Sequence, residues 1–112
     1  MTKSLNEKLA TLQNELRSIV AHLEAGNIIP AIDCTMVCHG YNANYLIEEA
    51  RKHVLHESVI ETAVTLTTNL YTTQIVLQHP AMSERNIRLA ISFVRKCQVA
   101  VDEMLLKMTI LN

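Results

Sequence analysis

Hydrophobic residues recur along the chain at alternating steps of three and four, the spacing that places an apolar stripe along one side of an α-helix. The clearest stretch follows Ser4 and Glu7, whose S-x-x-E spacing is typical of a capping box at a helix N-terminus. Its stripe consists of Leu5, Leu9, Leu12, Leu16, Ile19 and Leu23. Gly26 follows the last of these leucines, where a C-terminal cap is expected. The pattern therefore predicts a first helix that ends just before Gly26.

A second helix is predicted to begin between Asn27 and Pro30, because Asn caps helices and Pro is tolerated in a first turn. We expect this helix to end near His56. Two overlapping stripes fit it equally well, and both have Ala43 and Ala50 at their centre. Their members are Met36, Gly40, Ala43, Ile47, Ala50 and Val54 for one stripe, and Ile32, Met36, His39, Ala43, Leu46, Ala50 and His53 for the other. Such small residues either permit close helix packing or leave a pocket.

The third predicted helix opens with another capping box, Ser58 and Glu61, and ends before Pro80. Its stripe consists of Val59, Ala63, Leu66, Leu70, Thr73 and Leu77, widened by Ile60, Val64, Thr67 and Tyr71. The segment is rich in Thr and Val, which are weaker helix formers, so a pair of strands is the rival interpretation. The cap, the length and the lack of a glycine turn favour the helix.

The fourth predicted helix is capped by Ser83 and continues close to the end of the chain. Its stripe consists of Ile87, Ala90, Val94, Cys97, Val101, Met104, Met108 and Leu111. Short connections between successive helices imply antiparallel neighbours. We therefore expect an all-α fold, with residues 1–112 forming a single domain that is an antiparallel, up-down four-helix bundle.

The last predicted helix also carries apolar residues away from its core stripe, namely Leu89, Val99, Leu106 and Ile110. Segment 59–79 contains no Lys or Arg, which likewise points to more burial than a lone bundle supplies. The alternative is that these residues are simply exposed, as many apolar residues of monomers are. We expect the four to contact a protein partner, either another protein or a second copy in a homodimer.

Cys34, Cys38 and His39 form the most chemically suggestive stretch. Residues four apart lie on one side of a helix, and that spacing suits shared metal ligation better than a disulfide. In an up-down bundle His22 and His79 would lie at the same end. The pattern thus predicts a site for zinc or another soft metal at Cys34, Cys38, His39 and His22. The C-x2-C zinc signature is absent, however, so the alternative is that the cysteines are buried core residues.

The 112 residues carry a formal net charge of −1, which gives no general attraction to nucleic acid or to acidic membranes. Arg85, Arg88, Arg95 and Lys96 make the start of the last helix basic, and this patch either meets phosphate or an acidic protein or is a solvated face. An odd number of cysteines and the absence of a recognisable leader favour a reducing, cytoplasmic location. We expect neither nucleic acid nor a membrane as partner.

The sequence shows no nucleophile with a matching base and orienting acid, so an enzyme is not expected. Glu48 and Glu49 are adjacent, and they therefore point in different directions on a helix. The resulting prediction is a small, non-enzymatic regulatory or adaptor protein that binds another protein through a helix face, as a homodimer and without a cofactor. The alternative is a helical bundle that binds a metal or small ligand through the region of Cys34, Cys38 and His39.

Overall fold

The computed structural model describes residues 2–38, 44–52, 56–80 and 82–111. Its first helix, α1 (Thr2–Glu24), buries all six residues of the predicted stripe to an exposure of 2% or less. The prediction of this stripe is confirmed. The helix begins at Thr2, so Ser4 lies inside its first turn and the predicted start at a Ser4 capping box is wrong by two residues.

The end of α1 has the hydrogen bonds of a Schellman motif. The amide of Gly26 donates to the carbonyl of Leu23 at 3.1 Å, and the amide of Asn27 donates to the carbonyl of His22 at 2.8 Å. Gly26 has a φ of 78°, a left-handed conformation that costs glycine little. The predicted cap at Gly26 is confirmed, and it turns the chain directly into the next helix.

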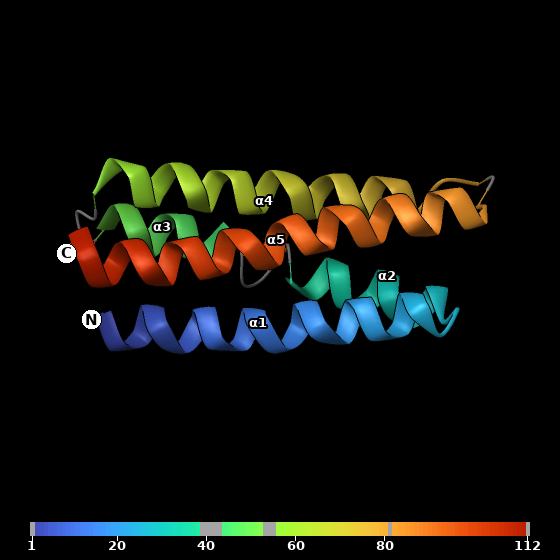
Figure 1. Cartoon of the computed structure of the whole chain (residues 1–112), viewed down its shortest axis with the longest axis horizontal. Helices are drawn as coiled ribbons and strands as arrows, with labels where there is room; N and C mark the ends of the chain where they lie inside the picture. The colour runs from blue at the N-terminus through green and yellow to red at the C-terminus, as the bar shows by residue number, and fades with distance from the viewer. Residues whose placement is uncertain (1, 39–43, 53–55, 81, 112) are drawn as a thin grey trace.

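The region predicted as one second helix contains two helices, α2 (Ile28–Val37) and α3 (Asn44–Lys52). Asn27 is the N-cap residue of α2, and Pro30 lies in its first turn, as predicted. The described residues therefore form five helices, and the expected count of four is wrong. Figure 1 shows α2 and α3 following one another along the side of the molecule where the single helix was expected.

The buried positions of α2 and α3 can be compared across the break between the two helices. In α2 the buried positions are Ala31 and Thr35, followed by Cys38. In α3 the buried positions are Leu46, Glu49 and Ala50, while Tyr45 is 42% exposed. On one continuous helix, residues 11 or 18 apart lie on nearly the same side, as Thr35 and Leu46 or Ala31 and Glu49 would, so the buried positions alone do not require the break.

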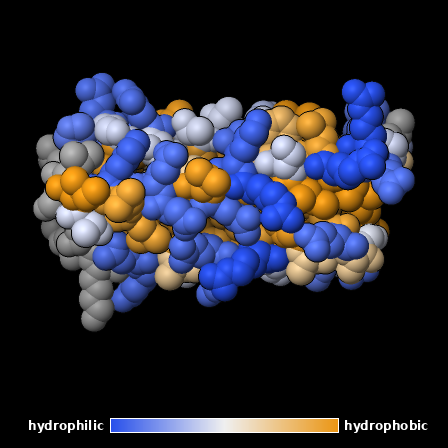
Figure 2. Space-filling view, viewed as in Figure 1, coloured by the Kyte–Doolittle hydropathy of each residue, from blue (hydrophilic) through white to orange (hydrophobic). Residues whose placement is uncertain are grey.

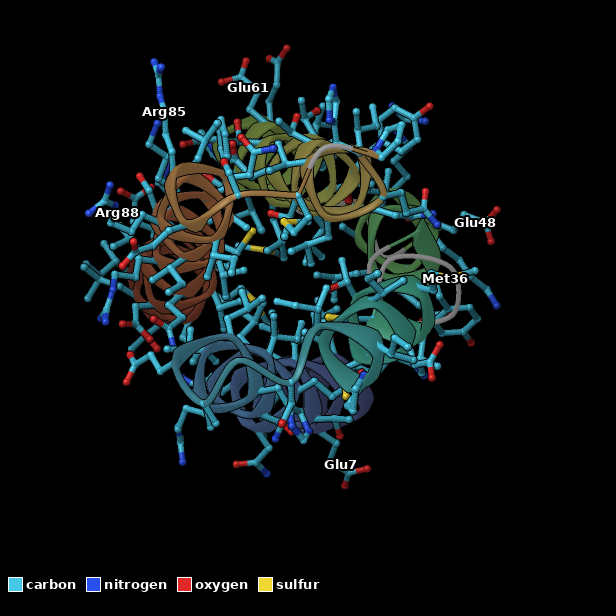
Figure 3. All side chains as sticks on the ribbon, turned by 90° about the vertical axis from the view of Figure 1, so that its right-hand side faces the viewer. Glu7, Met36, Glu48, Glu61, Arg85 and Arg88 are labelled. Carbon is cyan, nitrogen blue, oxygen red and sulfur yellow. The ribbon has the colours of Figure 1, made fainter. Side chains whose placement is uncertain are left out.

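Neither predicted stripe of the second helix is buried throughout α2 and α3. Met36, which both stripes include, is 45% exposed and lies on the outside of the molecule (Figure 3). Leu46 and Ala50 are buried as one stripe predicted. Ile32 and Ile47 are partly buried against the core, and the other members His39, Gly40, Ala43, His53 and Val54 lie outside the described residues.

The next helix, α4 (Glu57–Leu77), buries all six residues of its predicted stripe. Its N-cap is His56, whose Nδ1 accepts a hydrogen bond from the amide of Ser58 at 3.1 Å. The predicted capping box is thus replaced by a cap two residues earlier. Val64 and Tyr71 were expected to widen the buried stripe, but they are 41% and 53% exposed.

The threonines of α4 form hydrogen bonds within their own helix. Six of them donate their hydroxyl to the carbonyl four residues earlier, at 2.8–3.1 Å; these are Thr62, Thr65, Thr67, Thr68, Thr72 and Thr73. The buried Thr62 and Thr73 therefore leave no hydroxyl donor unsatisfied. The rival strand interpretation fails, since none of the described residues forms a strand.

The last helix, α5 (Glu84–Leu111), begins at the predicted cap. The hydroxyl of Ser83 accepts a hydrogen bond from the amide of Asn86 at 3.3 Å. The predicted stripe is buried from Ala90 to Met108, while Ile87 at its start is half-buried.

The helices pack side by side into an all-helical molecule of 43 × 20 × 19 Å. Its most extensive contact is between α4 and α5, and α1 packs against both α2 and α5. Figure 1 shows the start of α1 and the end of α5 at the same end of the molecule. Within the described part of the chain, none of the helices has the length and apolarity needed to cross a membrane.

Candidate functional site

The outer side of α5 carries the four apolar residues that the sequence singles out. Leu89, Val99, Leu106 and Ile110 are 45%, 57%, 60% and 69% exposed. Val99 and Leu106 lie opposite the buried stripe of the same helix, and Leu89 and Ile110 flank them, so that the set extends over about six turns. We call this set, with the polar residues between its members, the α5 outer face. Figure 2 shows separate apolar patches along this side of the molecule, interrupted by hydrophilic side chains.

Three exposed polar residues, Ser92, Lys96 and Glu103, occupy the positions between the apolar members of the α5 outer face. The ammonium of Lys96 lies 5.0 Å from the centre of the Phe93 ring, one turn earlier on the same helix. The α5 outer face therefore combines apolar contact area with one cationic and one anionic side chain. Such a mixture is typical of surfaces that bind a partner in a defined orientation.

The orientation of α5 is fixed by polar contacts along both of its edges. Toward α1, Gln13 donates to Asp102 at 3.1 Å, and the Arg95 guanidinium lies 3.3 Å from the Glu24 carboxylate. This ion pair is more than half exposed, so it contributes little to stability.

Toward α4, the Lys107 ammonium donates to the hydroxyl of Thr62 at 2.8 Å and to the carbonyl of Ser58 at 3.4 Å. With both edges held, the α5 outer face points away from the core.

A groove of about 400 Å³ runs beside Val99, between α4 and α5. Thr65 and Asn69 contribute to its α4 wall, and Lys96 and Glu103 contribute to its α5 wall. A second hollow near the start of α5 is lined by Leu89 and by Ile75 of α4. The α5 outer face is therefore bordered by recesses that could receive side chains of a packed partner.

The four cationic side chains of the basic patch predicted for the first half of α5 have different surroundings. Arg85 and Arg88 are exposed and project outward from α5, as Figure 3 shows. Arg95 is directed to Glu24, and Lys96 lies against Phe93. The four cations therefore do not converge on a common point where one phosphate could be held.

The cysteines of the predicted metal site lie in different surroundings. Cys38 is fully buried, and burial holds the pKa of its thiol well above the usual value, with smaller contributions from Glu15, Cys97 and Cys34. A protonated thiol must lose its proton before it can bind a metal. Cys34 is half-buried in α2 and lines a hollow of about 420 Å³ together with Glu15 and Asp33.

The structure places only one of the two histidines of that predicted site. His22 lies in the last turn of α1, next to the start of α2, whereas Cys38 lies at the opposite end of α2. His39 lies outside the described residues. Across the residues that are described, no three His, Cys, Asp or Glu side chains are grouped so as to hold a metal ion. A metal site at Cys34, Cys38, His39 and His22 stays a prediction.

The third cysteine, Cys97, is a core residue of α5. Its thiol lies 3.8 Å from the carbonyl of Leu66 on α4, and burial raises the pKa of Cys97 to about 12. Figure 3 shows sulfur atoms on the inside of the ring of helices. The alternative prediction, that cysteines serve as small core residues, describes Cys38 and Cys97.

Sequence reasoning missed the exposed apolar residues of α4. Val64, Tyr71 and Ile75 are 41%, 53% and 52% exposed, and they share one side of the helix. The signal that could have found them is the absence of Lys and Arg from segment 59–79, which was interpreted as extra burial without a location. This observation adds apolar surface on the helix next to α5.

Comparison of the chain with protein-family models, with curated protein sequences and with solved structures finds no match. The functional argument therefore depends on the surfaces and contacts of the chain itself.

Proposed function

We propose that this chain is a small, non-enzymatic adaptor or regulatory protein that binds another protein through the α5 outer face. The observation that carries this proposal is the exposure of Leu89, Val99, Leu106 and Ile110 along one side of a single helix. Water contact with these side chains is unfavourable, and a packed partner would remove it at about 25 cal/mol per Å² of apolar surface.

The packing of α5 against its neighbouring helices favours this proposal. Its core stripe is buried, and contacts to Gln13 on α1 and to Thr62 on α4 hold its edges. A face presented by a fixed helix loses little conformational entropy when a partner packs on it. The exposed stripe of α4 is shorter, so α5 is the better candidate for the main contact.

The test is the substitution Leu106→Glu, with Ile29→Glu as its matched control. Both positions are exposed apolar residues, at 60% and 73%, but Ile29 lies in the first turn of α2. We expect Leu106→Glu to leave the far-UV circular dichroism helical while it abolishes association, because a carboxylate would have to be buried without a partner. Association is measured as mass in sedimentation equilibrium and as retention of partners by the immobilised chain.

Ile29→Glu should leave both the mass and the retention of partners unchanged. The proposal is wrong if Leu106→Glu matches the wild type in both measurements. It is also wrong if the two variants lose association equally, since the effect would then not belong to α5.

A further inference from the structure

The α5 outer face has seven evenly distributed positions, three on either side of Val99. From Leu89 to Ile110 its positions follow steps of three and four in strict alternation, and Val99 is the central position. The apolar members and the polar members Ser92, Lys96 and Glu103 are all exposed. The positions lie 3, 7 and 10 residues before Val99 and 4, 7 and 11 residues after it, so a reversed copy of the stripe matches it to within one residue.

A two-fold axis through Val99 pairs the face with itself in a consistent way. Val99 then meets Val99 of the second copy, and Leu89 meets Ile110 at each end. Between these apolar layers, Lys96 lies opposite Glu103 and Ser92 lies opposite Leu106. Every layer is either apolar, oppositely charged or a small hydroxyl against leucine, so no like charges are opposed.

The charges also select the direction of the second helix. In a parallel, in-register pair Lys96 would lie beside Lys96 of the other copy, and Glu103 beside Glu103. Like charges brought together at an interface are unfavourable, whereas the antiparallel arrangement replaces both contacts by ion pairs. Charge complementarity therefore favours one orientation of one occupant.

The cations at the start of α5 fit the same arrangement. Arg85 and Arg88 are exposed in the first turns of the helix. In the antiparallel pair Arg88 would lie beside the last turn of α5 of the second copy, and Arg85 would lie just beyond it. The last turn of a helix carries partial negative charge on its free carbonyl groups, which favours nearby cations.

We infer that the α5 outer face is an interface for a second copy of this chain, with the two α5 helices packed antiparallel about a two-fold axis through Val99. This inference rests on the proposed function, and it names the partner and its orientation. The paired stretch from Leu89 to Ile110 would be about 32 Å long at the rise of an α-helix. That length is most of the 43 Å extent of the molecule.

A charge exchange tests the orientation. In the variant K96E the substituted carboxylate opposes Glu103 of the second copy, and in E103K the substituted ammonium opposes Lys96. Each variant alone should therefore dimerise more weakly than the wild type, with a dissociation constant raised about tenfold or more. An equimolar mixture of the two variants restores both ion pairs, as does the double variant K96E/E103K, and both should regain wild-type association.

Sedimentation equilibrium provides the measurement, because a monomer of 12.6 kDa and a dimer of twice that mass are readily separated. Both positions are exposed, so the variants should fold, and far-UV circular dichroism checks that they do. A disulfide gives an independent test: V99C should form a covalent dimer under mild oxidation, since position 99 faces itself across the axis. S92C, whose position faces Leu106, is the matched control and should not link to itself.

Three results would overturn the inference: a wild-type chain that remains monomeric, variants that recover nothing on mixing, or S92C linking as readily as V99C. The proposed function is judged separately by Leu106→Glu. A monomeric wild-type chain that still retains a different protein in a Leu106-dependent manner would remove this inference and leave the proposed function in place.

Discussion

At the scale of single residues, the aliphatic pattern predicts burial well wherever one helix keeps one phase. Leu12, Leu66 and Val94, which belong to the stripes of three different helices, are fully buried. Prediction fails at Met36 and Tyr71, which lie near a stripe in the sequence but are exposed. Their positions depend on where neighbouring helices pack, and the spacing within one helix does not contain that information.

The buried thiols predict how stability depends on pH. Burial raises the pKa of Cys97 from 9.0 to about 12, and that of Cys38 further still. Below pH 9 the thiols are protonated in both the folded and the unfolded chain. As pH rises from 9 toward 12, the unfolded thiols ionise while the folded ones do not, so the free energy of unfolding should fall by about 1.4 kcal/mol per pH unit for each thiol.

Urea unfolding followed by circular dichroism between pH 8 and pH 11 measures this slope. Cys97→Ala is the matched variant: it lowers stability at every pH through the lost packing, but it should also make the fall above pH 9 shallower by one thiol's contribution. Equal slopes in the variant and the wild type would contradict the assignment of Cys97 as a thiol that stays protonated in the core.

At the scale of elements, helix ends that depend on local chemistry were predictable. Gly26 and Ser83 both act as caps where the sequence places them. The start of α4 was not predicted correctly, because His56 fulfils the role that was assigned to Ser58. Histidine is not among the residues that usually cap helices, so the sequence offered a more typical but wrong alternative.

The cap of α4 gives a prediction that separates the two assignments. His56→Ala should lower the free energy of unfolding by about 1 kcal/mol, because the amide of Ser58 loses its acceptor. Ser58→Ala should change it by less than about 0.5 kcal/mol, since the amide of Ser58 is retained. Urea unfolding measures both, and His56→Asn should keep most of the stability as the conservative control. A larger loss in Ser58→Ala than in His56→Ala would support the capping box that the sequence suggested.

The division of the second predicted helix into α2 and α3 was beyond the sequence pattern. Two rival stripes fitted that region, and their overlap already showed that no single side of the helix was clearly apolar. The structure divides the region into two helices, with Thr35 buried in α2 and Leu46 buried in α3. An ambiguous stripe is therefore a useful warning that a long helix is interrupted.

At the scale of the whole molecule, the sequence predicted an all-helical fold and an exposed apolar side of its last helix. Both follow from periodicity, which assigns each residue of a helix to a side. The arrangement of the predicted metal site was harder to derive from the sequence, because its members were expected to converge from separate elements. Cys34 and Cys38 differ in burial, and His22 belongs to another helix, so their mutual placement depends on packing that the sequence does not specify.

The most direct test of the account is hydroxyl-radical footprinting of the wild-type chain over a range of protein concentrations. If α5 forms an interface, oxidation at Val99 and Leu106 should fall as the concentration rises through the dissociation constant, because the partner excludes water from them. Oxidation at Ile29 and Val64, which are exposed on α2 and α4, should stay constant. Val99 and Leu106 remaining as reactive as Ile29 at every concentration would contradict the claim that the α5 outer face binds a second copy of the chain.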